Sequence, residues 1–377
     1  MPKPCRVPHG EINEVPRKEF QRRHVFAGRR AELEPDFQGE TDMPTEARPT
    51  TRAMIEPSRL CFYSCKMCYH RFSDKQSVKP WPQVRAEIDA AVARGDNACD
   101  VTGGEPMIYP EIVELTRYCR AVGLPARIIT SGLSGPERTQ AVIDAGVESF
   151  LISMHGMAET HDDIFGVPGA RAKQERFIGY VDRQVPWDAN CVMLRQNQSE
   201  LHALAAYMLN FKPHPRFVNF INMNLHGPWA EHRAEAEPLL ADLNILGAEL
   251  NHAAFLLDEF GVGVTIRYFP VCKLANYLRP MICNDRQVAF DPREWSYDIG
   301  EKTVENFAAW GRRASEHTEE QGEPCCRCGL HHICGGMHAV SHRVSREIYG
   351  EQLTPEPLPG GVDPEDYYHY RRHATTL

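Results

Sequence analysis

From about residue 50 onward, short runs rich in β-branched and aromatic residues alternate with longer amphipathic stretches. Among the amphipathic stretches are Pro82–Arg94, which places Val84, Ile88, Ala91 and Val92 on one helical face, and Glu111–Ala121. Proline or glycine stands near the ends of these stretches, where helices commonly begin or end. The runs predicted to be strands are Arg52–Pro57, Ala98–Thr102, Ala126–Thr130, Ser149–Ser153, Asn190–Leu194 and Phe217–Asn222. This alternation predicts an α/β fold with a parallel sheet, arranged as a partial (β/α)6 TIM-like barrel.

The same pattern divides the chain into segments. The first of them is charged and interrupted by proline, with weak periodicity, which predicts an irregular leader. In order, the predicted segments are an N-terminal leader at 1–48, the barrel core at 49–235, a connecting helix at 236–262, a cysteine-rich domain at 263–350 that opens with a strand at Gly263–Tyr268, and a C-terminal tail at 351–377. The cysteine-rich domain has few periodic apolar runs, so we expect its fold to depend on metal.

Charge and hydropathy narrow the classes of partner. The 377 residues include 42 Lys plus Arg and 51 Asp plus Glu, for a net charge of -9, and no long run carries a single sign. Nucleic acid and anionic membranes are therefore not expected as partners. The sequence has no apolar run of about 18 residues and no apolar region near its start of the kind found in secretory signals, which predicts a cytoplasmic protein.

The chain has 13 cysteines, and a reducing cytoplasm leaves metal ligation or burial to explain them. Cys5, Cys99, Cys119 and Cys191 are scattered, and we expect them to be small buried residues. Most of the others fall into two groups, one near residue 65 and one near residue 330.

The first group has the spacing Cys61-x3-Cys65-x2-Cys68, directly after the first predicted strand. Active sites of barrels and parallel sheets lie at the carboxyl ends of the strands. Three thiolates can hold three irons of a cubane cluster and leave the fourth iron open. A zinc knuckle is the alternative, but a structural zinc site needs four ligands, and His70 is very close to the third cysteine in sequence.

On this motif the chain resembles the radical S-adenosylmethionine (SAM) superfamily over roughly residues 50–230. The resemblance implies a 4Fe-4S cluster that binds the amino and carboxylate groups of SAM, passes one electron to its sulfonium, and releases methionine and a 5′-deoxyadenosyl radical. Members commonly carry an aromatic residue before the third cysteine, whereas this chain has Met67. We expect Met67 to cover the adenine instead.

Further parts of the resemblance lie at successive strand ends. Thr102-Gly103-Gly104-Glu105-Pro106 matches the family's Gly-Gly-Glu-Pro pattern, whose backbone groups bind the methionine amino group of SAM. The resemblance adds Ser131, Ser153 and Arg195 as SAM-binding candidates. His155 and His161 lie near the same rim, and we expect loop hydrogen bonds rather than catalysis from them. The sequence indicates no particular catalytic acid or base.

The second group, Cys325-x2-Cys328-x5-Cys334, is similar to the auxiliary-cluster segment of SPASM and twitch radical SAM enzymes. The similarity implies a small C-terminal Cys-rich auxiliary-cluster domain with one 4Fe-4S cluster held by Cys272, Cys325, Cys328 and Cys334. Cys283 or Cys326 could replace one of these ligands, and a structural zinc is a competing interpretation. A flavodoxin or ferredoxin is the expected electron donor.

For the reaction, we expect hydrogen abstraction from a small natural-product or envelope-type metabolite, followed by oxidation or bond formation. Two alternatives stay open: a SPASM-type maturase of a ribosomal peptide, and a non-catalytic Fe-S or zinc scaffold. Substrate-pocket candidates follow the sixth predicted strand, and these are Asn222, Asn224, His226 and Trp229.

Overall fold

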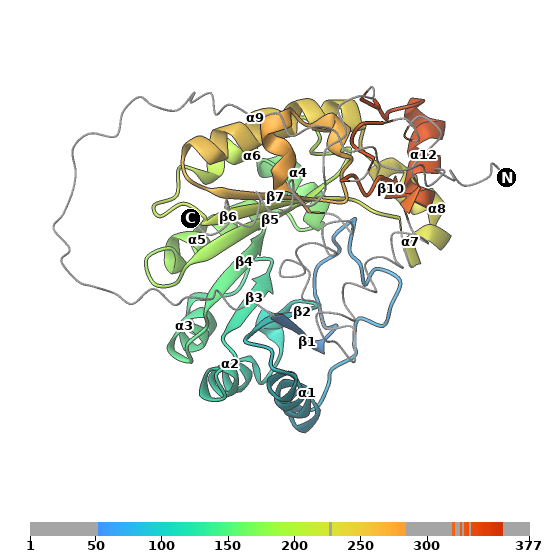
Figure 1. Cartoon of the computed structure of the whole chain (residues 1–377). Helices are drawn as coiled ribbons and strands as arrows, with labels where there is room; N and C mark the ends of the chain where they lie inside the picture. Colours follow the sequence, from blue (N-terminus) through green and yellow to red (C-terminus); the bar gives the residue numbers. More distant parts are fainter. Residues whose placement is uncertain are drawn as a thin grey trace, which may run out of the picture. The chain divides into compact units, whose positions relative to one another are not determined.

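In this computed structural model, the described residues are 52–225, 228–283, 319–320, 325, 328–331 and 333–356. They form one eight-stranded sheet in the order β1-β2-β3-β4-β5-β6-β7-β8, in which every neighbouring pair is parallel, and a small two-stranded sheet of β9 and β10 (Figure 1). The α/β architecture expected from the alternating pattern is confirmed.

The strands are β1 (Arg52–Ser58), β2 (Ala98–Gly103), β3 (Ala126–Thr130), β4 (Ser149–Ser153), β5 (Trp187–Met193), β6 (Phe217–Asn222), β7 (Gly263–Arg267), β8 (Ile282–Cys283), β9 (Glu319–Glu320) and β10 (Met337–His338). The α-helices are α1 (Trp81–Arg94), α2 (Ile112–Ala121), α3 (Pro136–Asp144), α4 (Ala158–Phe165), α5 (Ala170–Val181), α6 (Leu201–Met208), α7 (Pro228–Glu231), α8 (Arg233–Ala236), α9 (Leu243–Glu259) and α12 (Ala339–Tyr349). Short 3-10 turns are η1 (Pro106–Ile108), η2 (Glu237–Leu239), η3 (Val271–Lys273) and η4 (Asn276–Met281).

The six predicted strands all form, and β3, β4 and β6 have the predicted bounds. The largest difference is at β5, which begins at Trp187 rather than at residue 190. The sequence did not indicate this start because Asp188 is its second residue, and aspartate is rare inside strands. In the fold Arg216 pairs with that carboxylate at 2.5 Å.

The sheet does not end at the sixth strand. β7 pairs with β6 over five residues, and β8 pairs with β7, so the expected six-stranded count is short by two. The boundary expected at residue 263 thus separates β6 from β7, two strands that are hydrogen-bonded to each other in one sheet. The predicted leader and residues 357–377 of the predicted tail lie outside the described residues.

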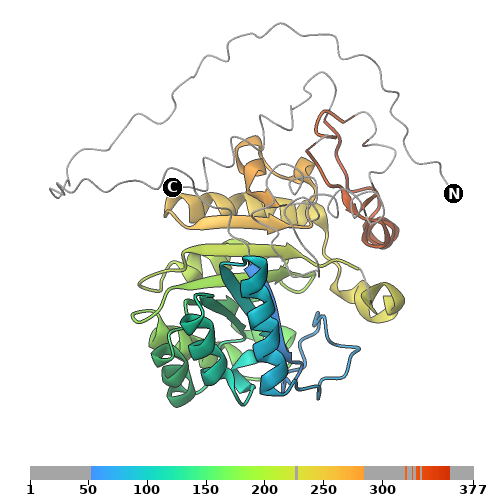
Figure 2. The same ribbon diagram turned by 60° about the horizontal axis from the view of Figure 1, so that its bottom comes forward.

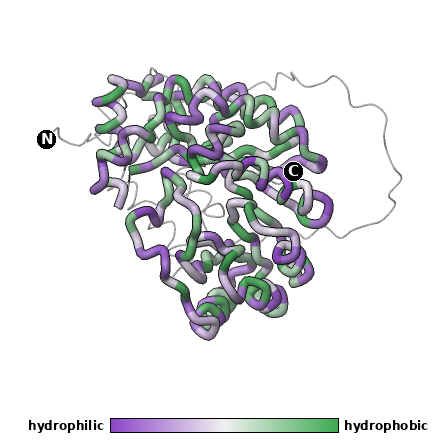
Figure 3. Tube along the Cα trace, turned by 180° about the vertical axis from the view of Figure 1, so that it is seen from behind, coloured by the Kyte–Doolittle hydropathy of each residue, from purple (hydrophilic) through white to green (hydrophobic). Residues whose placement is uncertain are grey.

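The two faces of the sheet differ in chemistry. One face is apolar and buried under helices such as α1, α2 and α5, with Ile128, Phe150 and Phe220 fully buried. Purple and green alternate along the helical coils, as expected for amphipathic helices (Figure 3). On the opposite face Asp100 accepts hydrogen bonds from both Arg52 and Arg127 at the amino ends of the first three strands. The scattered Cys99, Cys119 and Cys191 are fully buried, as predicted, and Cys5 lies outside the described residues.

A second hydrophobic cluster fastens α12 to the barrel. Figures 1 and 2 show α12, in red, beside the yellow segment of α7 and α8. Val344 of α12 is buried in this cluster, and Met67 and Phe72 of the cysteine loop pack against it. The cluster therefore joins the loop after β1 to the C-terminal part of the chain. Its buried members are Ile164, Leu194, Met223, Leu225, Trp229, Ala236, Leu239, Leu240 and Val344.

Among the described helices, none combines the length and apolar character needed to cross a lipid bilayer.

Candidate active site

The first cysteine group lies in the loop that leaves the carboxyl end of β1, and this loop is anchored on the end of α4. The Ser64 amide donates to the Phe165 carbonyl at 3.2 Å, and the Lys66 amide donates to the Ile164 carbonyl at 2.9 Å. Lys66 also forms an ion pair with Asp163 at 2.6 Å. Two backbone bonds and an ion pair therefore hold the stretch between Cys61 and Cys68 at one edge of the sheet.

The pKa values of two thiols in this loop are raised by burial and by neighbouring cysteines. Burial raises the pKa of Cys61, and a smaller contribution comes from Cys68. Burial raises the pKa of Cys65 to about 12, with Cys68 and Cys61 as the next causes. Bound iron would favour the thiolate form of these side chains. Among the described residues, no three Cys, His, Asp or Glu side chains are arranged to hold a single metal ion.

Gly103 and Gly104 bring the end of β2 against the chain that enters the cysteine loop. The Gly104 amide donates to the Ser58 carbonyl at 2.9 Å, and the Glu105 amide donates to the Leu60 carbonyl at 2.8 Å. A Cβ at residue 103 would lie 2.2 Å from the Ser58 carbonyl oxygen, and one at residue 104 would lie 2.2 Å from that of Leu60. Backbone atoms cannot swing aside, so both positions need glycine.

Glu105 organises this edge through a buried carboxylate. Its Oε1 accepts from the Thr130 hydroxyl at 2.6 Å and from the Met107 amide at 3.1 Å. Its Oε2 accepts from the Ser131 amide at 2.8 Å and from the Ser131 hydroxyl at 2.5 Å. With four donors around one carboxylate, the side chain joins the ends of β2 and β3.

Tyr63 extends this network into the cysteine loop. Burial and, to a smaller extent, the nearby Glu105 raise the pKa of its phenol to about 12, and a hydrogen bond with the Ser131 side chain opposes the rise. The tyrosine ring also meets Phe165 edge to face, with centroids 6.4 Å apart. The predicted residues Glu105 and Ser131 and the cysteine loop are therefore brought together at the carboxyl edge of the sheet.

The other predicted SAM-binding residues differ in their surroundings. Ser153 ends β4 and is partly exposed. Met67 is partly buried against the second hydrophobic cluster. The Arg195 guanidinium donates to the Leu240 carbonyl at 3.2 Å and lies 5.3 Å from the Tyr349 ring centroid. These contacts connect the residue that follows β5 to α12. A SAM contact by Arg195 stays a prediction.

His155 and His161 are buried and structural, as the sequence favoured. The Val192 amide donates to Nδ1 of His155 at 3.1 Å, and the His155 amide donates to Nδ1 of His161 at 3.2 Å. Burial lowers the pKa of His155 to about 3 and that of His161 to about 2. Both rings are therefore neutral at physiological pH and serve as acceptors for backbone amides.

The candidates for a substrate pocket at the end of β6 and in the loop after it are largely occupied by structural contacts. Asn222 donates to the Tyr268 carbonyl at 3.1 Å, Asn224 accepts from the Ser341 hydroxyl at 2.8 Å, and Trp229 is buried. A role of these side chains in a substrate pocket stays a prediction. His226 lies outside the described residues.

Sequence reasoning missed a polar ladder on the concave face of the sheet. Asn190, Asn219 and Thr265 occupy matching positions on β5, β6 and β7. The Thr265 hydroxyl donates to Asn219 at 3.0 Å, and Asn219 donates to Asn190 at 2.9 Å. The signal in the sequence is a polar residue that recurs in the middle of successive apolar strands. The interior of an ordinary barrel is instead filled by apolar side chains.

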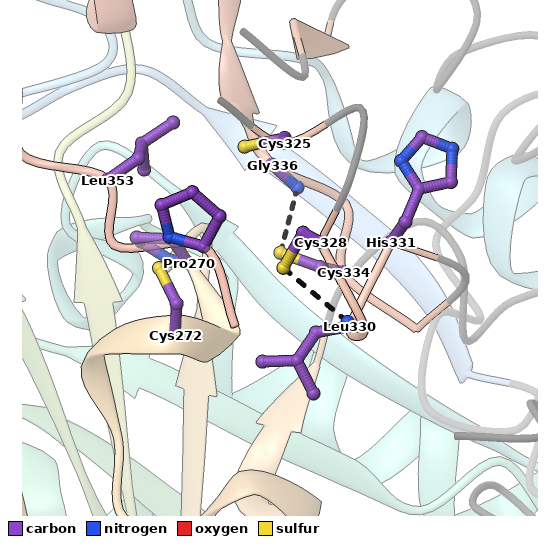
Figure 4. A pocket seen from close by; sticks show the side chains of 10 residues that line it. Pro270, Cys272, Cys325, Cys328, Leu330, His331, Cys334, Gly336 and Leu353 are labelled. Carbon is purple, nitrogen blue, oxygen red and sulfur yellow. Dashed lines mark hydrogen bonds between the residues drawn. The ribbon is translucent and has the colours of Figure 1, made fainter. Parts of the chain in front are cut away.

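The second cysteine group lies around one pocket next to the sheet (Figure 4). Cys272 of η3 stands on one side of it, with Cys328 and Cys334 opposite. The pocket is lined by Pro270, Cys272, Cys325, Cys328, Leu330, His331, Cys334, Gly336, Leu353 and Pro355. Of the two alternative ligands, Cys283 is buried on β8 and does not line this pocket, and Cys326 lies outside the described residues.

Backbone amides point at the sulfurs of this pocket. Sγ of Cys328 accepts from the Leu330 amide at 3.5 Å and from the Glu356 amide at 3.3 Å, and Sγ of Cys334 accepts from the Gly336 amide at 3.4 Å. Burial is the main cause that raises the pKa of Cys272. An apolar pocket with several cysteines and N–H donors aimed at sulfur fits the donor set of an iron–sulfur cluster.

Comparisons with known proteins agree with this geometry. The family model described as Radical SAM superfamily matches residues 55–208. The chain is 31% identical over 361 residues to the AdoMet-dependent heme synthase of Nitratidesulfovibrio vulgaris, which covers 83% of this chain and 93% of that protein. It is 28% identical over 195 residues to the PqqA peptide cyclase of Rhizobium meliloti, so it spans about half the length of that relative (50% of each chain).

Among solved structures, native anSMEcpe with bound AdoMet superimposes with a TM-score of 0.50 at 15% identity, covering 86% of this chain and 97% of that one. This likeness supports the fold. The near full-length similarity to an AdoMet-dependent heme synthase and the matching family model support the class of enzyme. The chain belongs to the radical SAM superfamily and is an enzyme of that family, which implies a 4Fe-4S cluster and SAM as its cofactors.

Proposed function

We propose that this enzyme binds its SAM-cleaving 4Fe-4S cluster through Cys61, Cys65 and Cys68 and abstracts hydrogen from a polar small molecule. The observation that carries the proposal is the contact between the entry of the cysteine loop and the end of β2. Two backbone hydrogen bonds, from Gly104 to Ser58 and from Glu105 to Leu60, join these segments. They hold the start of the cysteine loop against the end of β2, where Gly103 and Gly104 lie.

The residues of this edge have separable tasks. The three thiols would hold the cluster, which supplies one electron for reductive cleavage of SAM to a 5′-deoxyadenosyl radical. Backbone groups of Gly103 and Gly104 would bind the amino group of SAM. Further contacts would come from Met67, Glu105, Ser131, Ser153 and Arg195. Glu105 would in addition fix Ser131, because its carboxylate accepts hydrogen bonds from the Ser131 amide and hydroxyl.

For the substrate we favour a small metabolite of the natural-product or envelope type. The relative that matches over nearly its whole length is named for heme synthesis, whereas the match to the peptide cyclase covers half of that protein. The Asn190-Asn219-Thr265 ladder supports a polar ligand, since amide and hydroxyl groups can exchange hydrogen bonds with it. Modification of a ribosomal peptide is the second candidate, favoured by the name of the cyclase.

We further propose that Cys272, Cys325, Cys328 and Cys334 hold an auxiliary 4Fe-4S cluster in a SPASM or twitch-like domain. Four thiolates would close the coordination of that cluster, which suits electron transfer rather than SAM binding. It would accept an electron when the substrate is oxidised or a new bond forms. A flavodoxin or ferredoxin would supply the electron to the first cluster.

The test compares the wild type with a Cys61/Cys65/Cys68→Ala triple variant after anaerobic reconstitution. About eight irons per chain are expected in the wild type and about four in the variant, with 5′-deoxyadenosine formed from SAM and dithionite by the wild type alone. The matched control is Cys99→Ala, because Cys99 is a fully buried core residue. It should keep both iron and activity.

A wild type that takes up zinc instead of iron and does not cleave SAM would overturn the proposal and favour the non-catalytic scaffold. Zinc at the second group together with SAM cleavage would overturn only the auxiliary cluster. If a set of candidate peptides, and no small molecule, stimulates SAM cleavage, the substrate class is wrong.

A further inference from the structure

The helix α5 carries a fully buried glutamine that joins the ends of two strands. Nε2 of Gln174 donates to the Ser131 carbonyl and to the Ser153 carbonyl, each at 2.7 Å. The described register of β3 and β4 ends at the pair Thr130 and Ile152, one residue before these carbonyls. One amide group thus continues the connection between the strands beyond their ladder.

Arg171, one turn earlier on α5, fixes the orientation of this amide. Its Nη1 donates to Oε1 of Gln174 at 3.1 Å, and a guanidinium has no acceptor, so the NH2 group of the glutamine must face the two carbonyls. Nη2 of Arg171 donates to the Gly156 carbonyl in the loop after β4. The guanidinium also lies 4.9 Å from the ring centroid of Tyr207, which favours a buried cation.

The turn after β3 is shaped around this glutamine. Gly132 adopts a φ of 71°, and a Cβ there would lie 3.3 Å from Cγ of Gln174 and 3.2 Å from Cγ2 of Ile152. The glycine therefore allows the turn to close onto α5. Contact between this turn and the helix is tight, so the strand end has little freedom to shift.

Ser131 is consequently held through its amide and hydroxyl and also through its carbonyl. Glu105 receives its amide and hydroxyl hydrogens, and Gln174 donates to its carbonyl. Ser153 is held by the same glutamine through its carbonyl. Since side chains alternate along a strand, fixing that carbonyl also fixes the direction of the partly exposed Ser153 side chain.

We propose that Gln174 is a positioning residue of the SAM site, which sets the relative placement of Ser131 and Ser153 without touching SAM. The inference rests on the proposed function, in which these two serines contact SAM. Loss of the two donors would let the strand ends separate and would weaken SAM binding, while the cysteine loop, which is anchored on α4, would still take up its cluster.

The test uses full-length, anaerobically reconstituted protein and the variant Gln174→Met, which keeps much of the side-chain volume and removes both donors. Ile178→Ala is the matched control, because Ile178 is also fully buried on α5 and its loss destabilises the same helix while removing no hydrogen bond to either serine. For each protein, iron content, the Kd of SAM from the change in the spectrum of the reduced cluster, and KM and kcat for SAM cleavage are measured.

We expect Gln174→Met to raise the Kd and KM for SAM about tenfold, with kcat changed less than about twofold and with iron content as in the wild type. Ile178→Ala should bind SAM like the wild type. Wild-type SAM affinity in Gln174→Met, or an equal loss in both variants, would overturn the positioning role. A wild type that itself neither binds nor cleaves SAM would overturn the proposed function, and this inference with it.

Should Gln174→Met fail to fold, Arg171→Lys takes its place, since lysine keeps the charge but cannot reach both Gln174 and the Gly156 carbonyl with a planar fork. It should raise the Kd of SAM in the same direction by about threefold. An unchanged Kd in a folded Arg171→Lys variant would overturn the proposal.

Discussion

Glu105 accepts hydrogen bonds from both the amide and the hydroxyl of Ser131, at 2.8 and 2.5 Å. These two residues come from the ends of neighbouring strands, so the carboxylate acts as a fixed brace at the carboxyl edge of the sheet. Its other oxygen is occupied by Thr130 and Met107. All four hydrogen bonds are donated to Glu105, so a carboxylate, which only accepts, suits this position better than a side chain that carries a donor.

Replacing Glu105 with glutamine should therefore destabilise the fold. The new NH2 group would face two N–H or O–H donors, leaving them unpaired, at a cost of about 1–3 kcal/mol in the free energy of unfolding. Chemical denaturation of the wild type and of Glu105→Gln under anaerobic conditions measures this difference in the free energy of unfolding. The control is Glu114→Gln, an exposed side chain on α2 that pairs with Arg117 at 3.1 Å and should change stability by less than about 0.5 kcal/mol. Equal stabilities of the two variants would contradict the brace.

Gly104→Ala should disrupt the cysteine loop. The added Cβ would lie 2.2 Å from the Leu60 carbonyl oxygen, which forces the backbone before Cys61 to move. We expect a loss of about 3 kcal/mol or more in unfolding free energy and iron uptake clearly below that of the wild type. Gly135→Ala is the matched control, because no atom lies within 4 Å of its added Cβ and its φ of -71° suits alanine. Full iron uptake by Gly104→Ala would show that this contact is dispensable.

The sheet was largely predictable because its strands are short apolar runs bounded by proline and glycine. β7 was recognised as a strand, but its place beside β6 was not, since pairing with a strand some 45 residues earlier leaves no local signal. β8 has only two residues and so has no periodicity to detect. The offset start of β5 depends on Arg216, which neutralises Asp188 from outside the strand.

The candidate site was predictable as a set of motifs and less so as a set of contacts. The resemblance identified Gly103 and Gly104, but only the fold reveals that the Ser58 and Leu60 carbonyls leave no room for a side chain. Arg195 and Asn224 were predicted as site residues because they follow strands, and only the fold reveals that both also make contacts with later parts of the chain. Gln174 gave no signal at all, because a glutamine in an amphipathic helix is usually exposed.

The buried histidines should make stability depend on pH between about 7 and 5. Burial lowers the pKa of His161 to about 2 and that of His155 to about 3, whereas an unfolded histidine titrates near 6.5. Below that value the unfolded chain binds protons that the folded chain does not, so stability is complete above about pH 6.5 and falls as the pH decreases. Each histidine should contribute a loss of about 2 kcal/mol between pH 7 and 5.

The measurement compares chemical unfolding of the wild type and of His161→Gln at both pH values. Glutamine can still accept the His155 amide hydrogen but does not titrate, so the variant should lose about 2 kcal/mol less than the wild type over this range. Contributions common to both proteins, such as the exposed histidines, cancel in the difference. Identical pH dependence would mean that His161 is protonated in the folded protein.

Single substitutions should separate the possible ligands of the auxiliary cluster. Cys272 lines the pocket with Cys325, Cys328 and Cys334, whereas Cys283 is buried on β8 outside it. Because a closed cubane needs all four thiolates, Cys272→Ala should lower the iron content from about eight to about four per chain, while SAM cleavage at the first cluster persists. Cys283→Ala makes the same substitution at a fully buried cysteine outside the pocket and should keep about eight irons. If Cys283→Ala loses the iron instead, β8 supplies the fourth ligand, and the pocket must rearrange around iron for that sulfur to reach it.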